Sequence, residues 1–294
     1  MRKDLREILT YNPFVMITNF RGGFPLIFIL IISMFSGAMG QPTTLPDPPD
    51  PPDPLLSAVI TPGPLLLHLP GIGGPRMCDD YMLRGLSEGG VNANLVICDW
   101  TENDPGIAAL QGYARNRREA QRIANLIAAH AAADPNSPIY LTAHSGGCGL
   151  AVWALEKLPP NLTVRTLLLI APALSPGYDL SHALAHVQGQ AFAFSSTFDT
   201  VVLGTGTKLF GTIDGVQTAA AGFGGFVQPP GADPAMYRKL VSRPYQPEWI
   251  KYGNFGDHIG AMSRIFSRAI LAPLIVASAP PATQPSDSAH SPAH

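Results

Sequence analysis

Two kinds of segment alternate along the middle of the chain. Short, continuous apolar runs are separated by stretches in which apolar residues recur at helical spacing. The apolar runs cover residues 65–69, 94–100, 139–143, 164–170 and 191–195. Short apolar strands separated by helices predict a parallel sheet that is covered on both faces.

The segments between the runs predict helices. The clearest is 114–132, where the alanines and isoleucines between residues 120 and 128 repeat every three or four positions and charged residues fill the rest. Further helices are expected over 79–88, 148–158 and 261–271. Because 171–190 has room for one helix only, we expect an α/β fold with a mostly parallel central sheet and no large cap domain.

The N-terminal segment has the composition of an export signal. Basic residues precede an apolar run over 24–35, and Ala38 and Gly40 are small residues suited to cleavage before Gln41. We expect residues 1–40 to be a signal peptide or an uncleaved membrane anchor. The protein is then exported to the periplasm, cell envelope or extracellular space, with a possible membrane tether through residues 24–40.

The composition divides the rest of the chain. Proline and aspartate dominate residues 41–54, which predicts an extended linker. Residues 277–294 are rich in Ala, Pro and Ser and are expected to form a disordered tail. The folded domain is therefore expected over 55–276.

Composition also narrows the classes of partner. The chain of 294 residues has 46% hydrophobic residues, 14% charged residues and a net charge of −2. Without a basic stripe, nucleic acid is not expected as a partner. The cysteines Cys78, Cys98 and Cys148 form no C-x-x-C pair, so neither a metal site nor a disulfide framework is expected, although one disulfide of unspecified pairing stays open.

The sequence Ala143-His144-Ser145-Gly146-Gly147 is the most informative motif. It follows an apolar strand and precedes a helical segment, which is the context of a nucleophile elbow. Such a turn needs small residues two positions before and after the serine, and Ala143 and Gly147 meet that need. The alternative is that Ser145 only caps the helix.

The motif and its neighbours resemble the α/β-hydrolase family over most of residues 60–265. The resemblance implies that Ser145 is the nucleophile. The glycine-rich loop 68–74 after the first strand resembles the family's oxyanion loop, so the N–H groups of Ile72 and Gly146 are expected to form the oxyanion hole. A phosphate-binding loop is the competing idea, but the Gly-Lys-Ser/Thr ending is missing.

The resemblance also implies the other two members of a triad. Asp199, which follows the apolar run 191–195, is the expected acid; Asp214 is its main rival and Asp179 the third candidate. His258, on a glycine-flanked loop late in the domain, is the expected general base. The order serine, acid, histidine is that of the family.

The remaining histidines are assigned other places. His144 is expected to pack at the elbow and His68 to be structural. The histidines on helical segments are expected to meet solvent: His130, His182 and His186.

The sequence therefore predicts an exported serine hydrolase acting on a small-molecule or lipid-like acyl substrate. An ester, a thioester or an amide would be cleaved through an acyl-enzyme, without cofactor or metal. An inactive scaffold protein on the same fold and an acyltransferase are the alternatives. The glycine-rich stretch 203–253 either covers the site, with Phe223 and Phe226 as an apolar wall, or packs irregularly against the sheet edge. The oligomeric state is not indicated.

Overall fold

A six-stranded parallel sheet forms the centre of the protein. The computed structural model describes residues 52–102 and 106–278, which lie in one compact unit, Pro51–His294. The strand order is β2-β1-β3-β4-β5-β6, and every neighbouring pair is parallel. The strands are β1 (Leu65–Leu69), β2 (Asn94–Ile97), β3 (Ile139–His144), β4 (Thr166–Ile170), β5 (Ala191–Ser195) and β6 (Leu240–Pro244). The predicted fold class is confirmed.

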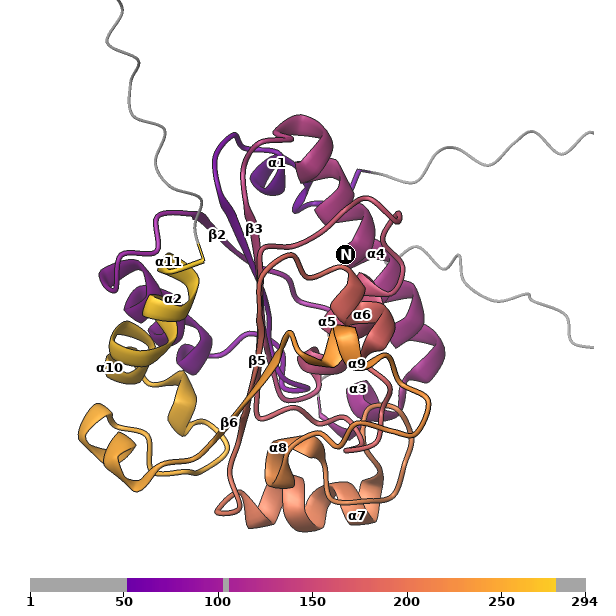
Figure 1. Ribbon diagram of the computed structural model, residues 1–294, viewed down its shortest axis with the longest axis vertical. Coiled ribbons are helices and arrows are strands. Elements are labelled where there is room, and N and C mark those ends of the chain that lie inside the picture. The colour runs from indigo at the N-terminus through magenta and orange to yellow at the C-terminus, as the bar shows by residue number, and fades with distance from the viewer. Residues whose placement is uncertain (1–51, 103–105, 279–294) are drawn as a thin grey trace, which may run out of the picture. The chain divides into compact units, whose positions relative to one another are not determined.

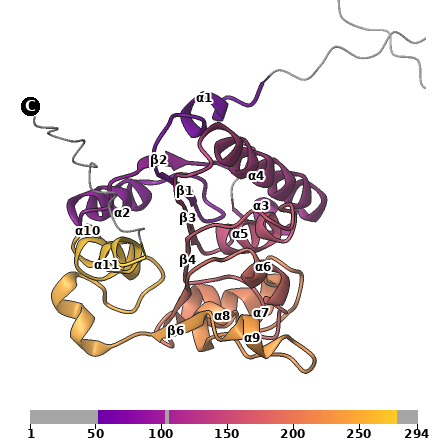
Figure 2. The same ribbon diagram turned by 45° about the horizontal axis from the view of Figure 1, so that its top comes forward.

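Helices cover both faces of the sheet (Figures 1 and 2). One layer holds α1 (Leu56–Val59), α4 (Tyr113–Ala133), α5 (Gly147–Leu155) and α6 (Ser181–Ala185). The opposite layer holds α2 (Met77–Glu88), α10 (Arg264–Phe266) and α11 (Ala272–Val276). Shorter helical segments complete the described chain: α3 (Ile107–Gln111), η1 (Thr200–Gly206), α7 (Thr207–Phe210), α8 (Ala221–Gly224), α9 (Pro234–Tyr237), η2 (Pro247–Tyr252), η3 (Gly260–Met262) and η4 (Ser267–Leu271).

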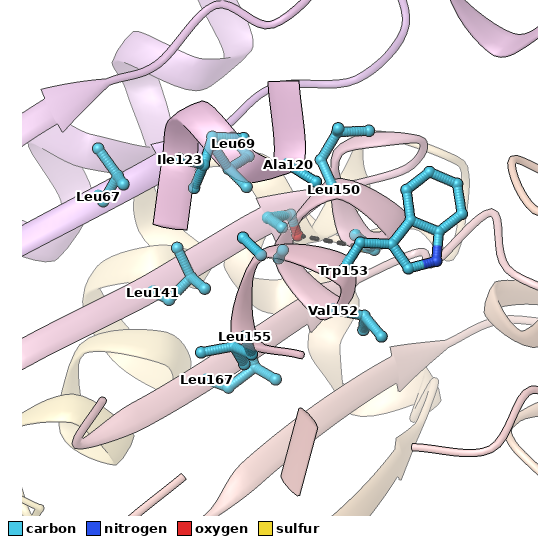
Figure 3. Packing of buried hydrophobic residues seen from close by; sticks show 14 of the residues in the cluster. Leu67, Leu69, Ala120, Ile123, Leu141, Leu150, Val152, Trp153, Leu155 and Leu167 are labelled. Carbon is cyan, nitrogen blue, oxygen red and sulfur yellow. Dashed lines mark hydrogen bonds between the residues drawn. The ribbon is translucent and has the colours of Figure 1, made fainter. Parts of the chain in front are cut away.

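The larger core lies between the sheet and the α4–α5 layer. Successive strand residues point to opposite faces, so Leu67, Leu141 and Leu167 share this face. They meet Ile123 of α4 and Leu155 of α5, as Figure 3 shows. Every residue of α5 is buried because the helix lies between the sheet on one side and α4 and α6 on the other. A helix held on all sides fixes the position of the turn that precedes it.

Two predicted strands are shorter than expected. β2 ends at Ile97, because the Asp99 carboxylate accepts hydrogen bonds from the backbone and hydroxyl of Thr101 and bends the chain. Trp100 is thereby turned into the core, where its indole N–H donates to the carbonyl of Pro70 at 2.8 Å. β4 begins at Thr166, and Val164 forms only an isolated bridge.

The sequence pattern misses β6 and the breaks in the last helix. β6 is an edge strand whose side chains are half-buried or exposed, so it lacks the continuous apolar run of the central strands. The helix predicted over 261–271 is a series of short segments from η3 to α11. Ser263 has extended backbone, and its hydroxyl oxygen accepts a hydrogen bond from the N–H of Phe266, which separates η3 from α10. Pro273, which lacks an N–H, follows the π-helical turn η4.

Several predictions lie outside the described residues. These are the export segment 1–40, most of the linker 41–54 and all but the first two residues of the tail 277–294. Over residues 52–102 and 106–278, no helix is both long and apolar enough to cross a membrane.

Candidate active site

The loops that follow β1, β3, β5 and β6 carry the predicted site residues. Because the sheet is parallel, the carboxyl ends of these strands lie along one edge, where parallel α/β sheets commonly bind ligands. The strand register thus brings together segments that are far apart in the sequence.

Ser145 occupies the sharp turn between β3 and α5. Its φ is 52°, a left-handed conformation that a non-glycine residue rarely adopts. Its N–H donates to the carbonyl of Ile170 at 2.9 Å, and its own carbonyl accepts from Ala173 at 3.1 Å. A Cβ on Gly147 would overlap the carbonyl oxygens of residues 69 and 70. The elbow geometry therefore depends on glycine at this position.

A hydrogen-bonded chain links Ser145, His258 and Asp199. The Ser145 Oγ lies 3.0 Å from Nε2 of His258, and Nδ1 of His258 lies 2.6 Å from Oδ2 of Asp199. Ser145 and Asp199 are each 4% exposed, whereas the His258 side chain is 19% exposed. When Nδ1–H donates to the carboxylate, Nε2 of a neutral imidazole is free to accept a hydrogen bond from the serine hydroxyl.

Asp199 is held in place by the start of the π-helical turn η1. Its Oδ1 accepts a hydrogen bond from the N–H of Leu203 at 3.4 Å. The two rival acids are engaged elsewhere: Asp214 accepts from the N–H and hydroxyl of Ser175, and Asp179 from those of Ser181. Of the three candidates, the structure brings only Asp199 to His258.

His144 contacts the backbone of His258. Its Nε2–H donates to the His258 carbonyl at 3.0 Å, and the two ring centroids are 4.8 Å apart. Burial, followed by the neighbouring His258, holds the pKa of His144 well below 6.5, so its imidazole is neutral. Packing at the elbow was predicted, but this bond joins residues 114 positions apart and no local pattern indicates it.

The glycine-rich loop lies directly against the elbow. A turn closed by the N–H of Gly74 and the carbonyl of Gly71 at 3.0 Å shapes the loop. A Cβ on Gly71 would lie 3.3 Å from that of Ser145, and one on Gly146 would lie 2.6 Å from Cγ2 of Ile72. Among the described residues, neither Ile72 nor Gly146 has a hydrogen-bond acceptor for its N–H. Both predicted oxyanion-hole donors are thus available beside the serine.

A cavity of about 260 Å³ opens beside Ser145 and His258. Its apolar lining comes from Ile72, Val202 and Ile259, of which the last two are at least 40% exposed. Its polar lining includes Arg76, Cys78, Asp79 and His144.

Phe223 and Phe226 do not line this cavity. Phe223 packs against Leu203 and Ala220, and Phe226 packs against the core on the α5 side of the sheet. The idea that these two rings form its apolar wall is therefore wrong. The short helix α8 places Phe223 against Gly204 instead, within 3.2 Å of where a Cβ would be.

Two further histidines are buried. His68 lies between Thr142 Oγ1 at 3.0 Å and Asp79 Oδ1 at 2.8 Å, as a structural residue should. The prediction that His130 meets solvent is wrong, because its side of α4 packs under α1, where Nδ1–H donates to the carbonyl of Val59. His182 is exposed and His186 half-buried.

The three cysteines are free thiols. Burial, reinforced by the adjacent Asp79, raises the pKa of Cys78, which therefore remains a neutral thiol beside the cavity. Burial also raises the pKa of Cys98 to about 12. In the described part of the chain, no group of three or more His, Cys, Asp and Glu side chains is arranged to hold a metal ion.

Comparisons with known proteins give remote structural likenesses only. No family model matches the chain, and no curated protein matches it in sequence. A lipase B from Aspergillus fumigatus is 15% identical with a TM-score of 0.43, over 73% of this chain and 53% of the lipase, so the chain spans about half of that protein. The NocB thioesterase domain of the nocardicin cluster is 15% identical with a TM-score of 0.37, over 74% and 96% of the two chains. RedJ, solved with a polyethylene glycol molecule in its active site, is 14% identical with a TM-score of 0.33, over 69% and 84%.

These TM-scores are too low to support a statement about activity, and the fold is identified from the geometry of the chain itself. The parallel sheet, the strand–turn–helix at Ser145 and the order serine, acid, histidine are those of the α/β-hydrolase fold.

Proposed function

We propose that the protein is a serine hydrolase that cleaves a carboxylic ester, or a thioester or amide, through an acyl-enzyme on Ser145. The observation that supports this most is the unbroken chain of hydrogen bonds from Ser145 Oγ through His258 to the buried Asp199. A hydroxyl bonded to a neutral imidazole, which is in turn held by a buried carboxylate, is the arrangement that activates serine.

In the proposed reaction, Nε2 of His258 accepts the Ser145 proton as Oγ attacks the acyl carbon. The tetrahedral oxyanion receives hydrogen bonds from the N–H groups of Ile72 and Gly146. When the carbon–leaving-group bond breaks, the imidazolium returns the proton to the leaving group. Water then attacks the acyl-enzyme, again with His258 as the base, and releases the acid.

Asp199 has two roles in this scheme. It keeps the proton of His258 on Nδ1, and its negative charge stabilises the imidazolium. His144 helps to position the base, because its hydrogen bond to the His258 carbonyl holds the backbone of His258 in place.

The substrate is proposed to be a small-molecule or lipid-like acyl compound. The cavity of about 260 Å³ and its apolar lining by Ile72, Val202 and Ile259 support an ester with an apolar portion.

Labelling with a fluorophosphonate probe, followed by mass spectrometry, tests the proposal. We expect the label on Ser145 in the wild type and none in Ser145→Ala or His258→Ala. Matched controls are Ser87→Ala and His182→Ala, which remove an exposed serine and an exposed histidine. A folded but unlabelled wild type would contradict the hydrolase and favour the scaffold alternative, and product analysis with an added alcohol acceptor would identify an acyltransferase.

We propose in addition that residues 1–40 direct export. The basic residues, the apolar run and the small residues before Gln41 support this. Sequencing the N-terminus of the exported protein tests it: Gln41 indicates cleavage, an intact N-terminus in the membrane fraction indicates an anchor, and full-length protein retained in the cytoplasm contradicts export.

A further inference from the structure

We infer that Arg76 binds an anionic group of the substrate, so that the preferred substrates are esters bearing a carboxylate or phosphate in addition to their apolar portion. This inference rests on the proposed function and names the substrate class of the same site. Arg76 lines the cavity that contains Ser145 and His258.

The fold sets the position of Arg76 through its backbone. It is the residue before α2, and its N–H donates to Oδ2 of Asp79 at 2.7 Å. The turn from Gly71 to Gly74 folds the chain so that the guanidinium lies against Gly73, where any Cβ would overlap its Nη2, Nε and Cζ. The positive charge is thereby placed on the same loop that supplies the proposed oxyanion donor Ile72.

The other charged or titratable groups that line the cavity leave this charge uncompensated. The buried carboxylate of Asp79 pairs with His68 at 2.8 Å, and the His258 imidazole is bonded to Asp199. His144 is neutral and bonded to a carbonyl. Across the described residues, the Arg76 guanidinium has no ion pair and donates no hydrogen bond. The guanidinium is therefore a free cation in the cavity that contains the nucleophile.

A free guanidinium favours a specific kind of ligand. Its planar set of donors matches carboxylate and phosphate oxygens, which it can bind with two parallel hydrogen bonds. Ile72, Val202 and Ile259 line the same cavity, so the apolar part of the substrate and its anionic group find partners within one space. Because Arg76 is exposed to solvent, we expect a modest preference, about fivefold in kcat/KM, which corresponds to about 1 kcal/mol.

Paired esters with and without a carboxylate test the inference. In one arm the anion is on the acyl group: 4-nitrophenyl hemiesters of succinic, glutaric and adipic acid are compared with the butanoate, pentanoate and hexanoate. In the other arm it is on the leaving group: 4-acetoxybenzoate is compared with 4-acetoxybenzamide. Each ratio of anionic to neutral kcat/KM is measured for the wild type, Arg76→Gln, Arg76→Lys and the control Arg84→Gln, which removes an exposed charge from α2.

We expect the ratio in at least one arm to fall about fivefold in Arg76→Gln, to recover in part in Arg76→Lys and to keep its wild-type value in Arg84→Gln. The wild-type preference should weaken as salt is added, because screening acts on a charge interaction and not on a steric one. Unchanged ratios in both arms, with the neutral esters still hydrolysed, would overturn the inference and leave the hydrolase intact. No hydrolysis of any ester together with an unlabelled Ser145 would overturn the proposed function and the inference with it.

Discussion

Replacing Asp199 by Asn tests how the buried carboxylate serves His258. The two oxygens of Asp199 face two donors: Oδ2 faces Nδ1–H of His258 at 2.6 Å, and Oδ1 faces the N–H of Leu203 at 3.4 Å. An asparagine has only one oxygen for these two donors. If its NH₂ faces His258, the imidazole must carry its proton on Nε2 and can no longer accept the Ser145 proton. If its NH₂ faces Leu203, two donors meet in a site that is 4% exposed.

The first orientation avoids an unpaired donor, so we expect the inactive tautomer to predominate. The loss in kcat/KM is then on the order of 10³- to 10⁴-fold, which is about 4–5.5 kcal/mol of transition-state stabilisation. The assay is hydrolysis of a neutral 4-nitrophenyl ester at pH 7.5, with thermal unfolding as a check on folding. Asp214→Asn is the matched control and should keep kcat/KM within about twofold. A loss below about tenfold in Asp199→Asn, or a loss in Asp214→Asn as large as that in Asp199→Asn, would show that the Asp199 carboxylate does not set the tautomer of His258.

Three further predictions concern stability. Gly147→Ala should lower the free energy of unfolding by about 1–3 kcal/mol, because the added methyl group overlaps backbone carbonyl oxygens. Gly177 has open space around it, so Gly177→Ala should change the free energy of unfolding little. Equal effects of the two substitutions in urea denaturation would contradict this prediction. Below pH 6.5 the unfolded chain protonates His144, whereas the buried imidazole stays neutral in the folded protein. The contribution of His144 to the free energy of unfolding is therefore complete above pH 6.5, and it decreases as the pH is lowered, by up to about 1.4 kcal/mol per pH unit. His144→Gln should flatten the pH dependence of stability between pH 6.5 and 5, and an unchanged slope would count against this prediction. Asp79→Asn should cost about 1–3 kcal/mol, because the amide has one oxygen for the two donors that the carboxylate satisfies, Nε2–H of His68 and the N–H of Arg76. The exposed Asp80→Asn should cost little in the same denaturation series.

The sheet and the elbow could be predicted because their determinants are local. The central strands are buried on both faces and therefore appear as continuous apolar runs, and the turn at Ser145 requires small residues at fixed offsets. β6 escaped prediction because its side chains are half-buried or exposed, so it lacks a continuous apolar run. The broken helix 260–276 depends on Ser263 and Pro273, which act through backbone bonds and not through apolar spacing.

The members of the candidate site could be predicted from the sequence only where the order of serine, acid and histidine along the chain identifies them. Sequence order could not choose between Asp199 and Asp214 on physical grounds, because the choice depends on which carboxylate the fold places against His258. The bond from His144 to the His258 carbonyl and the position of Arg76 over Gly73 arise from packing between loops. The packing of the half-buried Phe223 against Leu203 and Ala220 follows from the fold of α8 and has no signature in the sequence.

A crystal structure of the fluorophosphonate adduct tests most directly whether this edge of the sheet is an acylation site. We predict a phosphorus–oxygen bond to Ser145 Oγ, with the phosphonyl oxygen within hydrogen-bond distance of the N–H groups of Ile72 and Gly146. An adduct on another side chain, or a phosphonyl oxygen directed away from both N–H groups, would contradict it.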